Sequence, residues 1–199
     1  MTIDSAFKAL AFLSRRAALA IGLAAVMVPT IAMAQKSDKE IAAELAKPLP
    51  HGELVLGKAD APVTITEYAS LTCSHCAHFH NTVLPDLEKK YIDTGKVKLL
   101  LREFPLDNLA AAASMLSRCT DKDNGIKLLK ALFKRQDEWA FVQGNPVPAL
   151  FKIAKEFGFT KESFDKCLTN QKLLDDITNE RDRASKILGV RATPTFFVN

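Results

Sequence analysis

The sequence predicts an α/β fold in which an all-helical domain is inserted between the strands of one sheet. A β-branched strand, a helix and a second apolar strand follow one another over residues 62–104, in the order of a parallel β-α-β unit. Residues 107–188 then show helical periodicity, and a short β-type run returns only at 195–198. The last strand is therefore predicted to rejoin a sheet that the helical block interrupts.

The composition is that of an ordinary globular protein with little net charge. Of the 199 residues, 48% are hydrophobic and 25% are charged, and the formal charge of the whole chain is +4. Beyond residue 34 the chain carries 24 basic and 22 acidic side chains. So small an excess gives no reason to expect a nucleic-acid partner, because such partners are bound through clustered positive charge.

Residues 1–34 predict a cleaved signal peptide. Arg15 and Arg16 precede an uncharged run that ends in Ala32-Met33-Ala34, a small-x-small cleavage pattern. The alternative is an uncleaved membrane anchor, since about 18 uncharged residues can just span a bilayer. The paired arginines also resemble a twin-arginine signal, so the export route stays open.

The changes of pattern set the boundaries within the mature chain. They give a polar lead with a first short strand at 35–60, the β-α-β unit at 61–106, the inserted helical domain at 107–188 and the last strand at 189–199. The four strands are predicted at 53–56, 62–69, 96–104 and 195–198. The helix of the unit should run from Cys73 to about Tyr91. Pro85 should bend or divide it, because proline lacks the N–H donor and clashes with the preceding turn.

Five helices are predicted in the inserted domain, at 108–119, 124–136, 146–157, 160–168 and 172–188. The phenylalanines of this block are most simply its core, and they are Phe133, Phe151, Phe157 and Phe164. Trp139 could belong to that core or to the wall of a groove, and the sequence does not distinguish these placements.

The strongest chemical signal is Cys73-Ser74-His75-Cys76, which lies where the predicted strand turns into the helix. Unpaired N–H groups and the helix dipole would stabilise a thiolate at Cys73 there, and a protonated His75 would add to this effect. Cys76 follows three residues later, so the pair lies within one helical turn and can close a disulfide. This context indicates a redox-active pair.

A metal site is the competing interpretation of these cysteines. Cys73 and Cys76 could form half of a zinc or copper site together with His78 or His80. The chain has no second Cys/His pair at the usual spacing, which favours the redox interpretation.

Glu67 lies six residues before Cys73, on the same face of the predicted strand as Val63 and Ile65. Burial among apolar neighbours would favour the protonated form of Glu67 and let it accept a proton from Cys76 when Cys76 must act as a thiolate. The alternative is an acid at the strand end that reaches solvent.

The other two cysteines, Cys119 and Cys167, both fall in the helical block, each near the end of a predicted helix. A disulfide between them would close a loop of about 50 residues and stabilise the fold by about 4 kcal/mol in the chain-entropy model. In an exported protein we expect this structural disulfide rather than two separate buried thiols.

Thr193-Pro194 stands directly before the last β-type run. Proline at the first position of a strand need not donate to the sheet. A cis bond at Pro194 would place the Thr193 backbone beside the redox cysteines, where it could pair with an extended peptide.

With Cys73-x-x-Cys76 and Thr193-Pro194 together, the chain resembles the thioredoxin superfamily. Its helical insertion resembles that of the DsbA-type periplasmic oxidoreductases, and the resemblance extends from about residue 53 to residue 199. It implies a redox disulfide with Cys73 as the exposed nucleophile and a cis-proline at Pro194. It also favours the functional interpretation of Glu67, because a buried acid commonly occupies this position in the family.

The resemblance implies a location and partners as well. Proteins of this kind oxidise thiols of newly exported, unfolded polypeptides in the periplasm, and a DsbB-like membrane quinone reductase reoxidises them. No cofactor is implied, and we expect a monomer. A disulfide isomerase or reductase is the alternative enzyme, but the lead at 35–60 is too short for the dimerisation domain typical of such isomerases.

The sequence departs from the family pattern in three places. Ser74 stands where the oxidases have proline, and Thr72 stands where an aromatic residue is common, whereas His75 is kept. Thioredoxin folds also continue with another strand and a helix, and these are missing after Asn199. Because an unpaired strand edge is unfavourable, we expect a fragment, or a sheet that is incomplete or completed by a partner.

Overall fold

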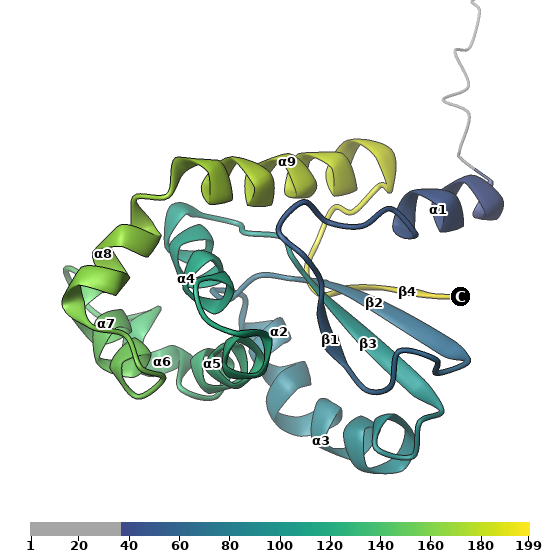
Figure 1. The fold of residues 1–199 in the computed structure, drawn as a ribbon, viewed down its shortest axis with the longest axis horizontal. Coiled ribbons are helices and arrows are strands. Elements are labelled where there is room, and N and C mark those ends of the chain that lie inside the picture. Colours follow the sequence, from purple (N-terminus) through teal and green to yellow (C-terminus); the bar gives the residue numbers. More distant parts are fainter. Residues whose placement is uncertain (1–36) are drawn as a thin grey trace, which may run out of the picture. The chain divides into compact units, whose positions relative to one another are not determined.

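The computed structural model describes residues 37–199, and the predicted signal peptide at 1–34 lies outside the described residues (Figure 1). The first described element is helix α1 (Asp38–Leu45). A capping box, in which Ser37 and Glu40 hydrogen-bond to each other's backbone, stabilises its N-terminus. In this part of the chain, none of the helices is long and apolar enough to cross a membrane.

Four strands form one mixed sheet in the order β1-β3-β2-β4. Strands β2 (Val63–Ala69) and β3 (Val97–Glu103) are parallel, whereas β1 (Leu54–Leu56) is antiparallel to β3 and β4 (Thr195–Val198) is antiparallel to β2. A parallel pair needs a crossover connection, which the helical stretch between β2 and β3 supplies. The predicted α/β sheet with a helical insertion before its last strand is confirmed.

One helical stretch follows the CxxC motif and leads from β2 to β3. It begins as α2 (Ser74–His78), widens into the π-helical segment η2 (Phe79–Val83), continues as α3 (Leu84–Leu87) and ends in a second π-helical segment, η3 (Glu88–Ile92). Pro85 lies in the first turn of α3, directly after η2. Because proline has no N–H to donate and needs room in the preceding turn, a wider π turn ahead of Pro85 divides the helix.

Every regular element that the structure describes in the insertion is a helix. Its described helices are α4 (Asn108–Arg118), α5 (Lys122–Lys134), α6 (Gln136–Trp139), α7 (Val147–Lys155), α8 (Lys161–Leu168) and α9 (Gln171–Ile187). The short helix α6 was not predicted as a separate element. Trp139 in α6 is fully buried and donates its indole N–H to the Leu132 carbonyl at 2.9 Å. Its ring therefore belongs to the core, because the indole has both apolar neighbours and a partner for its N–H.

The main core lies between the sheet, the helical stretch after Cys73 and the inserted helices. It combines side chains such as Leu99 of β3, Cys76 of α2 and Leu132 of α5. Of the predicted core phenylalanines, Phe133 and Phe164 are fully buried, and Phe151 and Phe157 are partly buried against the same cluster. Burial of apolar side chains from both parts therefore joins the insertion to the sheet.

A buried polar network also joins the sheet to α9. Arg102 of β3 donates to the Glu53 carboxylate at 2.6 Å and to the Tyr68 hydroxyl at 3.2 Å. Tyr68 in turn donates to the Glu180 carboxylate of α9 at 2.7 Å. Because each buried charge here has an opposite partner, the network holds β2, β3 and α9 in one arrangement.

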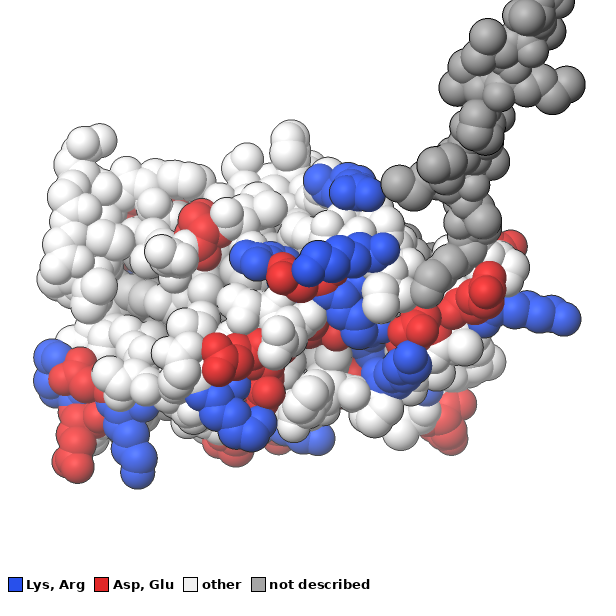
Figure 2. All heavy atoms as spheres, turned by 90° about the horizontal axis from the view of Figure 1, so that it is seen from above, with Lys and Arg blue, Asp and Glu red and all other residues white. Residues whose placement is uncertain are grey.

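Charged side chains of both signs are mixed on the surface. On the face seen in Figure 2, Lys and Arg side chains lie among Asp and Glu side chains, and no large patch of one sign forms. This distribution agrees with the nearly neutral charge of the chain beyond residue 34.

Candidate active site

Cys73 and Cys76 lie at the start of α2, where the chain has left β2. Cys73 is the N-cap residue, with φ −85° and ψ 119° and no side-chain cap hydrogen bond. Cys73 is partly exposed, whereas Cys76 is fully buried in the core. Both are free thiols, so the structure presents the reduced form of the pair.

The two thiols have opposite electrostatic environments. Partial burial opposes ionisation of Cys73, but the Thr193 side chain and the backbone N–H groups of Cys76 and His75 outweigh it and lower the pKa of the Cys73 thiol. Burial raises the pKa of the Cys76 thiol to about 12, and the neighbouring Cys73 adds to this effect. Cys73 is therefore the thiol that ionises first.

His75 reaches this site through its backbone, because its N–H is one of the groups that lower the pKa of Cys73. The residue itself is exposed. The predicted contribution of a protonated His75 imidazole to the Cys73 thiolate stays a prediction.

The Thr193–Pro194 peptide bond is cis, and it lies against the redox motif. The Thr193 carbonyl oxygen is 3.3 Å from the Cys73 sulfur, so the protonated thiol donates to it. Strand β4 follows directly and pairs with β2, with Thr195 opposite Tyr68.

Two further polar side chains hold the loop that carries Cys73. Gln136 of α6 is buried and donates from Nε2 to the carbonyl oxygens of Leu71 at 2.7 Å and of Cys73 at 3.1 Å. Thr72 donates its hydroxyl to the Asp107 carboxylate at 2.6 Å. The sequence did not single out these contacts, because the bonded residues are 65, 63 and 35 positions apart.

Glu67 is fully buried in β2, so the solvent-facing alternative for this acid is wrong. Its two carboxylate oxygens lie 3.2 and 3.0 Å from Nε2 of His80, which is also buried. The sequence suggested His80 only as a metal ligand. Its spacing of four residues from Cys76 is the signal that could have placed it on the same helix face.

The structure does not gather the residues of the metal interpretation. His80 faces Glu67, whereas His78 is exposed and its Nε2 lies 3.3 Å from the Thr82 hydroxyl. Within residues 37–199, no three side chains of His, Cys, Asp or Glu are placed to hold a metal ion. In the described structure, the two histidines of the metal interpretation therefore have other partners.

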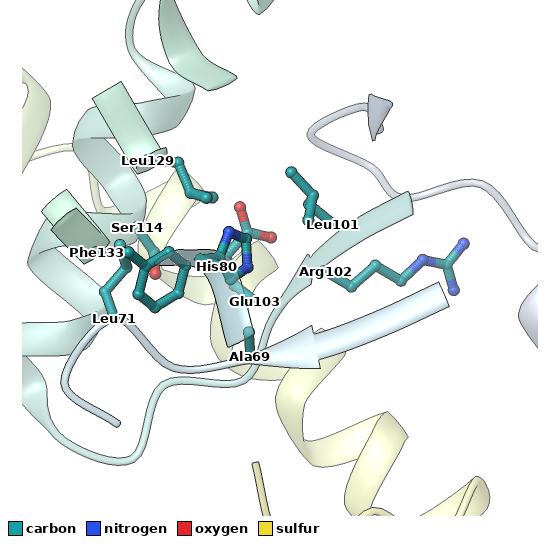
Figure 3. Close-up of a pocket in the computed structure, with 9 residues that line it drawn as sticks. All are labelled: Ala69, Leu71, His80, Leu101, Arg102, Glu103, Ser114, Leu129 and Phe133. Atoms are coloured by element: carbon teal, nitrogen blue, oxygen red, sulfur yellow. The ribbon is translucent and has the colours of Figure 1, made fainter. Parts of the chain in front are cut away.

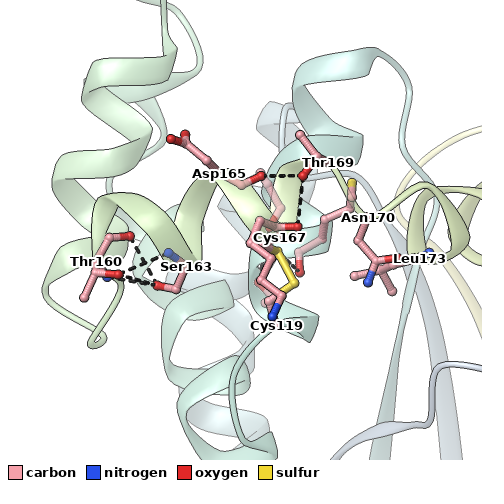
Figure 4. The surroundings of a disulfide bond; sticks show 12 residues. Cys119, Thr160, Ser163, Asp165, Cys167, Thr169, Asn170 and Leu173 are labelled. Carbon is pink, nitrogen blue, oxygen red and sulfur yellow. Dashed lines mark hydrogen bonds between the residues drawn. A yellow bond between two sulfur atoms is a disulfide. The ribbon is translucent and has the colours of Figure 1, made fainter.

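Cys119 and Cys167 form a disulfide within the insertion, with their sulfur atoms 2.07 Å apart (Figure 4). Cys119 follows the last residue of α4, and Cys167 lies in the last turn of α8. The bond links two helices that lie far apart in the chain. It is separate from the CxxC motif.

Comparison with known proteins agrees with this geometry. The thioredoxin family model matches residues 50–199. A candidate protein-disulfide oxidoreductase of Rickettsia bellii is 37% identical over 155 residues, which cover 76% of this chain and 58% of the relative. Disulfide bond formation protein D of Bacillus subtilis is 30% identical over 174 residues, which cover 82% and 75% of the two chains. The crystal structure of alpha-DsbA1 from Wolbachia pipientis is similar with a TM-score of 0.73 and 39% identity, over 78% of each chain.

The site and the fold together define a thioredoxin-fold protein with a dithiol at the start of a helix and a helical insertion. The chain belongs to the thioredoxin family and is a DsbA-like member of it. It spans little more than half the length of the Rickettsia relatives that it matches.

In the reduced protein, we expect iodoacetamide to label Cys73 near neutral pH and to leave Cys76 unlabelled. The pKa of Cys73 is lowered, and that of Cys76 is about 12, so Cys73 has the larger thiolate fraction there. Mass spectrometry after brief labelling at a series of pH values measures both residues. Denatured protein is the control, in which the two thiols should label alike. Equal labelling of both thiols in the native protein would contradict the assignment.

The same shifts give the reduced protein a pH-dependent stability. Because the pKa of Cys73 is lowered on folding, its ionisation stabilises the native state above the ordinary thiol pKa, and this contribution is lost as pH falls through the folded value. The contribution of Cys76 to the stability of the native state changes with pH in the opposite direction. It is complete below the ordinary thiol pKa and is lost as pH rises towards about 12.

Replacing Gln136 by leucine should lower the free energy of unfolding by about 1–3 kcal/mol, because two carbonyl oxygens of the redox loop lose their donor. It should also change the rate at which Cys73 is alkylated. Asn81→Leu is the matched control, because Asn81 also donates from its amide to a backbone carbonyl, that of Phe133 at 3.2 Å, which is not in the loop. If both variants changed the alkylation rate equally, the loop contact would have no specific effect.

Proposed function

We propose that this protein is an exported thiol:disulfide oxidoreductase that introduces disulfides into newly exported, unfolded polypeptides by exchange at Cys73 and Cys76. The observation that carries the proposal is the contrast between the two thiols. One is partly exposed with a lowered pKa, and the other is buried with a pKa of about 12. The Bacillus subtilis relative, which is named for disulfide bond formation, supports the same conclusion.

The reaction starts from the oxidised Cys73–Cys76 pair. A substrate thiolate attacks the Cys73 sulfur, the disulfide breaks, and Cys76 leaves as a thiolate that takes up a proton in its buried position. A second substrate thiolate attacks the substrate sulfur of the mixed disulfide, and Cys73 leaves as a thiolate at the helix N-terminus. The substrate gains a disulfide, and the protein is left as the reduced dithiol.

Stabilisation of the Cys73 thiolate is what makes such a pair oxidising. Thiol pKa values of about 7 in thioredoxin and about 3.5 in DsbA differ by about 5 kcal/mol in thiolate stabilisation. At about 1.4 kcal/mol per 30 mV, this difference accounts for roughly 100 of the roughly 150 mV between their potentials. A lowered pKa of Cys73 therefore shifts the potential in the oxidising direction.

The location and the partners belong to the same proposal. Residues 1–34 have the pattern of a cleaved signal peptide, and the Cys119–Cys167 disulfide suits an oxidising compartment. We place the mature protein in the periplasm as a monomer, with a DsbB-like membrane quinone reductase as its reoxidant. Exchange between thiols and disulfides needs no cofactor.

The redox equilibrium of the Cys73–Cys76 pair in glutathione buffers tests the proposal, together with oxidation of a reduced, unfolded polypeptide. A potential near about −120 mV with rapid substrate oxidation supports an oxidase. A potential near about −270 mV, or faster repair of a scrambled substrate than oxidation of a reduced one, favours the reductase or isomerase alternative. A pair that never forms a disulfide would overturn the proposal.

A further inference from the structure

The buried acid of the redox site is one half of a Glu67–His80 pair. The side chains of His80 and Glu67 are 1% and 0% exposed. Both carboxylate oxygens face Nε2 of His80, so the two side chains are hydrogen-bonded, and Nε2–H donates whenever Glu67 is ionised. The pair is therefore a buried, hydrogen-bonded unit.

This pair lies on the same side of the helical stretch as Cys76. His80 and Cys76 are four residues apart in the continuous stretch of α2 and η2, a spacing that places two side chains on one face. Both residues are buried, and Glu67 projects from β2, the strand that leads into the motif. Cys76 and His80 therefore share one face of the helical stretch, and His80 contacts Glu67.

His80 also lines a small cavity between the sheet and the inserted helices (Figure 3). Its Nδ1 is buried and has no hydrogen-bonding partner among the described protein groups. The Phe133 ring stacks on the imidazole, with the centroids 4.1 Å apart, and fixes its orientation. The cavity leaves about 10 Å³ for the centre of a water molecule, which is about what one water needs.

The charged and titratable groups considered with His80 come from several elements. Glu67 belongs to β2, Cys76 belongs to α2, and Glu103 and Arg102 of β3 line the cavity. The inserted helices add only Ser114, Leu129 and Phe133 to the lining. Burial opposes ionisation of Glu103, but Arg118 and His51 outweigh it and lower its pKa to about 2. Glu103 is therefore an ionised carboxylate in the lining of the cavity, and both of its oxygens accept from Arg118.

We propose that His80 is a positioning residue that makes Glu67 the proton donor and acceptor for Cys76, and that one water molecule binds His80 Nδ1 in this cavity. The inference rests on the exchange proposed at Cys73 and Cys76. When substrate attacks Cys73, the disulfide breaks, and Cys76 leaves with the electron pair of the bond.

Cys76 then takes one proton from the neutral Glu67–His80 pair, which becomes negative by one charge. The Nε2–H group of His80 stabilises this charge on the Glu67 carboxylate, and the water satisfies Nδ1. During reoxidation the proton returns from Cys76 to the pair, as the Cys76 thiolate attacks the mixed disulfide at Cys73.

The test measures reduction of the Cys73–Cys76 disulfide by dithiothreitol across pH, in the wild type and in two variants. His80→Phe keeps the stacked ring and removes both nitrogens, whereas His80→Gln keeps an amide N–H for Glu67. We expect His80→Phe to slow reduction by roughly 10- to 100-fold. Direct general acid catalysis accelerates a reaction by about 10²–10⁴-fold, and the expected loss is at or below the low end of that range because Glu67 remains. We expect its pH profile to change, and His80→Gln to recover part of the rate.

His78→Phe is the matched control, because this exposed histidine lies two residues earlier on the same helix. It should be reduced at the wild-type rate. An unchanged pH profile in His80→Phe, or equal slowing in His78→Phe, would overturn the proposal. If His80→Phe does not fold, the deciding measurement is the reduction rate of the Glu67→Gln/His80→Gln double variant. If this variant is reduced as fast as Glu67→Gln alone, His80 acts through Glu67. If the two substitutions slow reduction additively, the proposal is contradicted.

A crystal structure of the wild type tests the water site directly. A water molecule within hydrogen-bonding distance of His80 Nδ1 would support the proposed water site, and a cavity without water would overturn it. None of these measurements needs a polypeptide substrate. A protein that fails to oxidise polypeptides would therefore refute the proposed function and still report on His80.

Discussion

Replacing Cys76 by alanine should convert the protein into a trap that holds a substrate on Cys73 as a mixed disulfide. Cys73 is the partly exposed thiol with the lowered pKa, and Cys76 is the buried partner that would otherwise displace the substrate. Without Cys76, the adduct can be resolved only by another thiol, and no internal disulfide can form. Catalytic oxidation of a reduced polypeptide should fall to the uncatalysed rate. Non-reducing gels and intact mass measure the adduct and its site.

Cys73→Ala is the matched control for this trap. It removes the exposed thiol and leaves only the buried one, so no adduct should form under the same conditions. Adducts on Cys76 in that variant, or full oxidase activity in Cys76→Ala, would show that the roles of the two cysteines are assigned wrongly.

Removing the Cys119–Cys167 disulfide should lower the free energy of unfolding by about 4 kcal/mol. The bond joins residues that are 48 positions apart, and a crosslink of this span restricts the unfolded chain by about this amount in the loop-entropy model. The Cys119→Ala/Cys167→Ala double variant is the test, measured by urea unfolding with the linear extrapolation. The loss is a large share of the roughly 5–15 kcal/mol that stabilises a typical domain.

The single variant Cys119→Ala is the control, because it breaks the same bond and leaves the buried Cys167 side chain in place. It should lose a similar amount of stability, whereas a cavity effect at Cys167 would appear only in the double variant. A loss below about 1 kcal/mol in both would contradict the loop-entropy explanation and indicate a compact unfolded state.

The redox motif and the alternation of the fold could be predicted because their signals are local. Two cysteines three residues apart between a β-branched run and a helical pattern describe both the element and its chemistry. The strands were accordingly predicted within one residue of their observed bounds. Pro85 divided the helix for an equally local reason, since a missing N–H and a crowded preceding turn need no tertiary partner.

The details of the site depend on partners that are distant in the chain. Gln136 holds carbonyl oxygens 65 and 63 residues away, and Glu67 pairs with His80, which is 13 residues further on. The sequence showed that Glu67 lies on an apolar strand face, but the residue that faces it depends on how the helix packs on that strand. Trp139 presented the same problem, because its burial depends on where the insertion meets the core.

The sequence therefore specified the elements of this protein, their order and the pair of cysteines that reacts, because backbone preferences and periodicity act over a few residues. The tertiary structure specified the burial of Cys76, the Thr193 carbonyl beside Cys73 and the His80 ring beside Glu67. These contacts form only when side chains from separate elements are packed into one core. Burial and local contacts then shift the pKa values of the two thiols in opposite directions, although Cys73 and Cys76 lie only three residues apart.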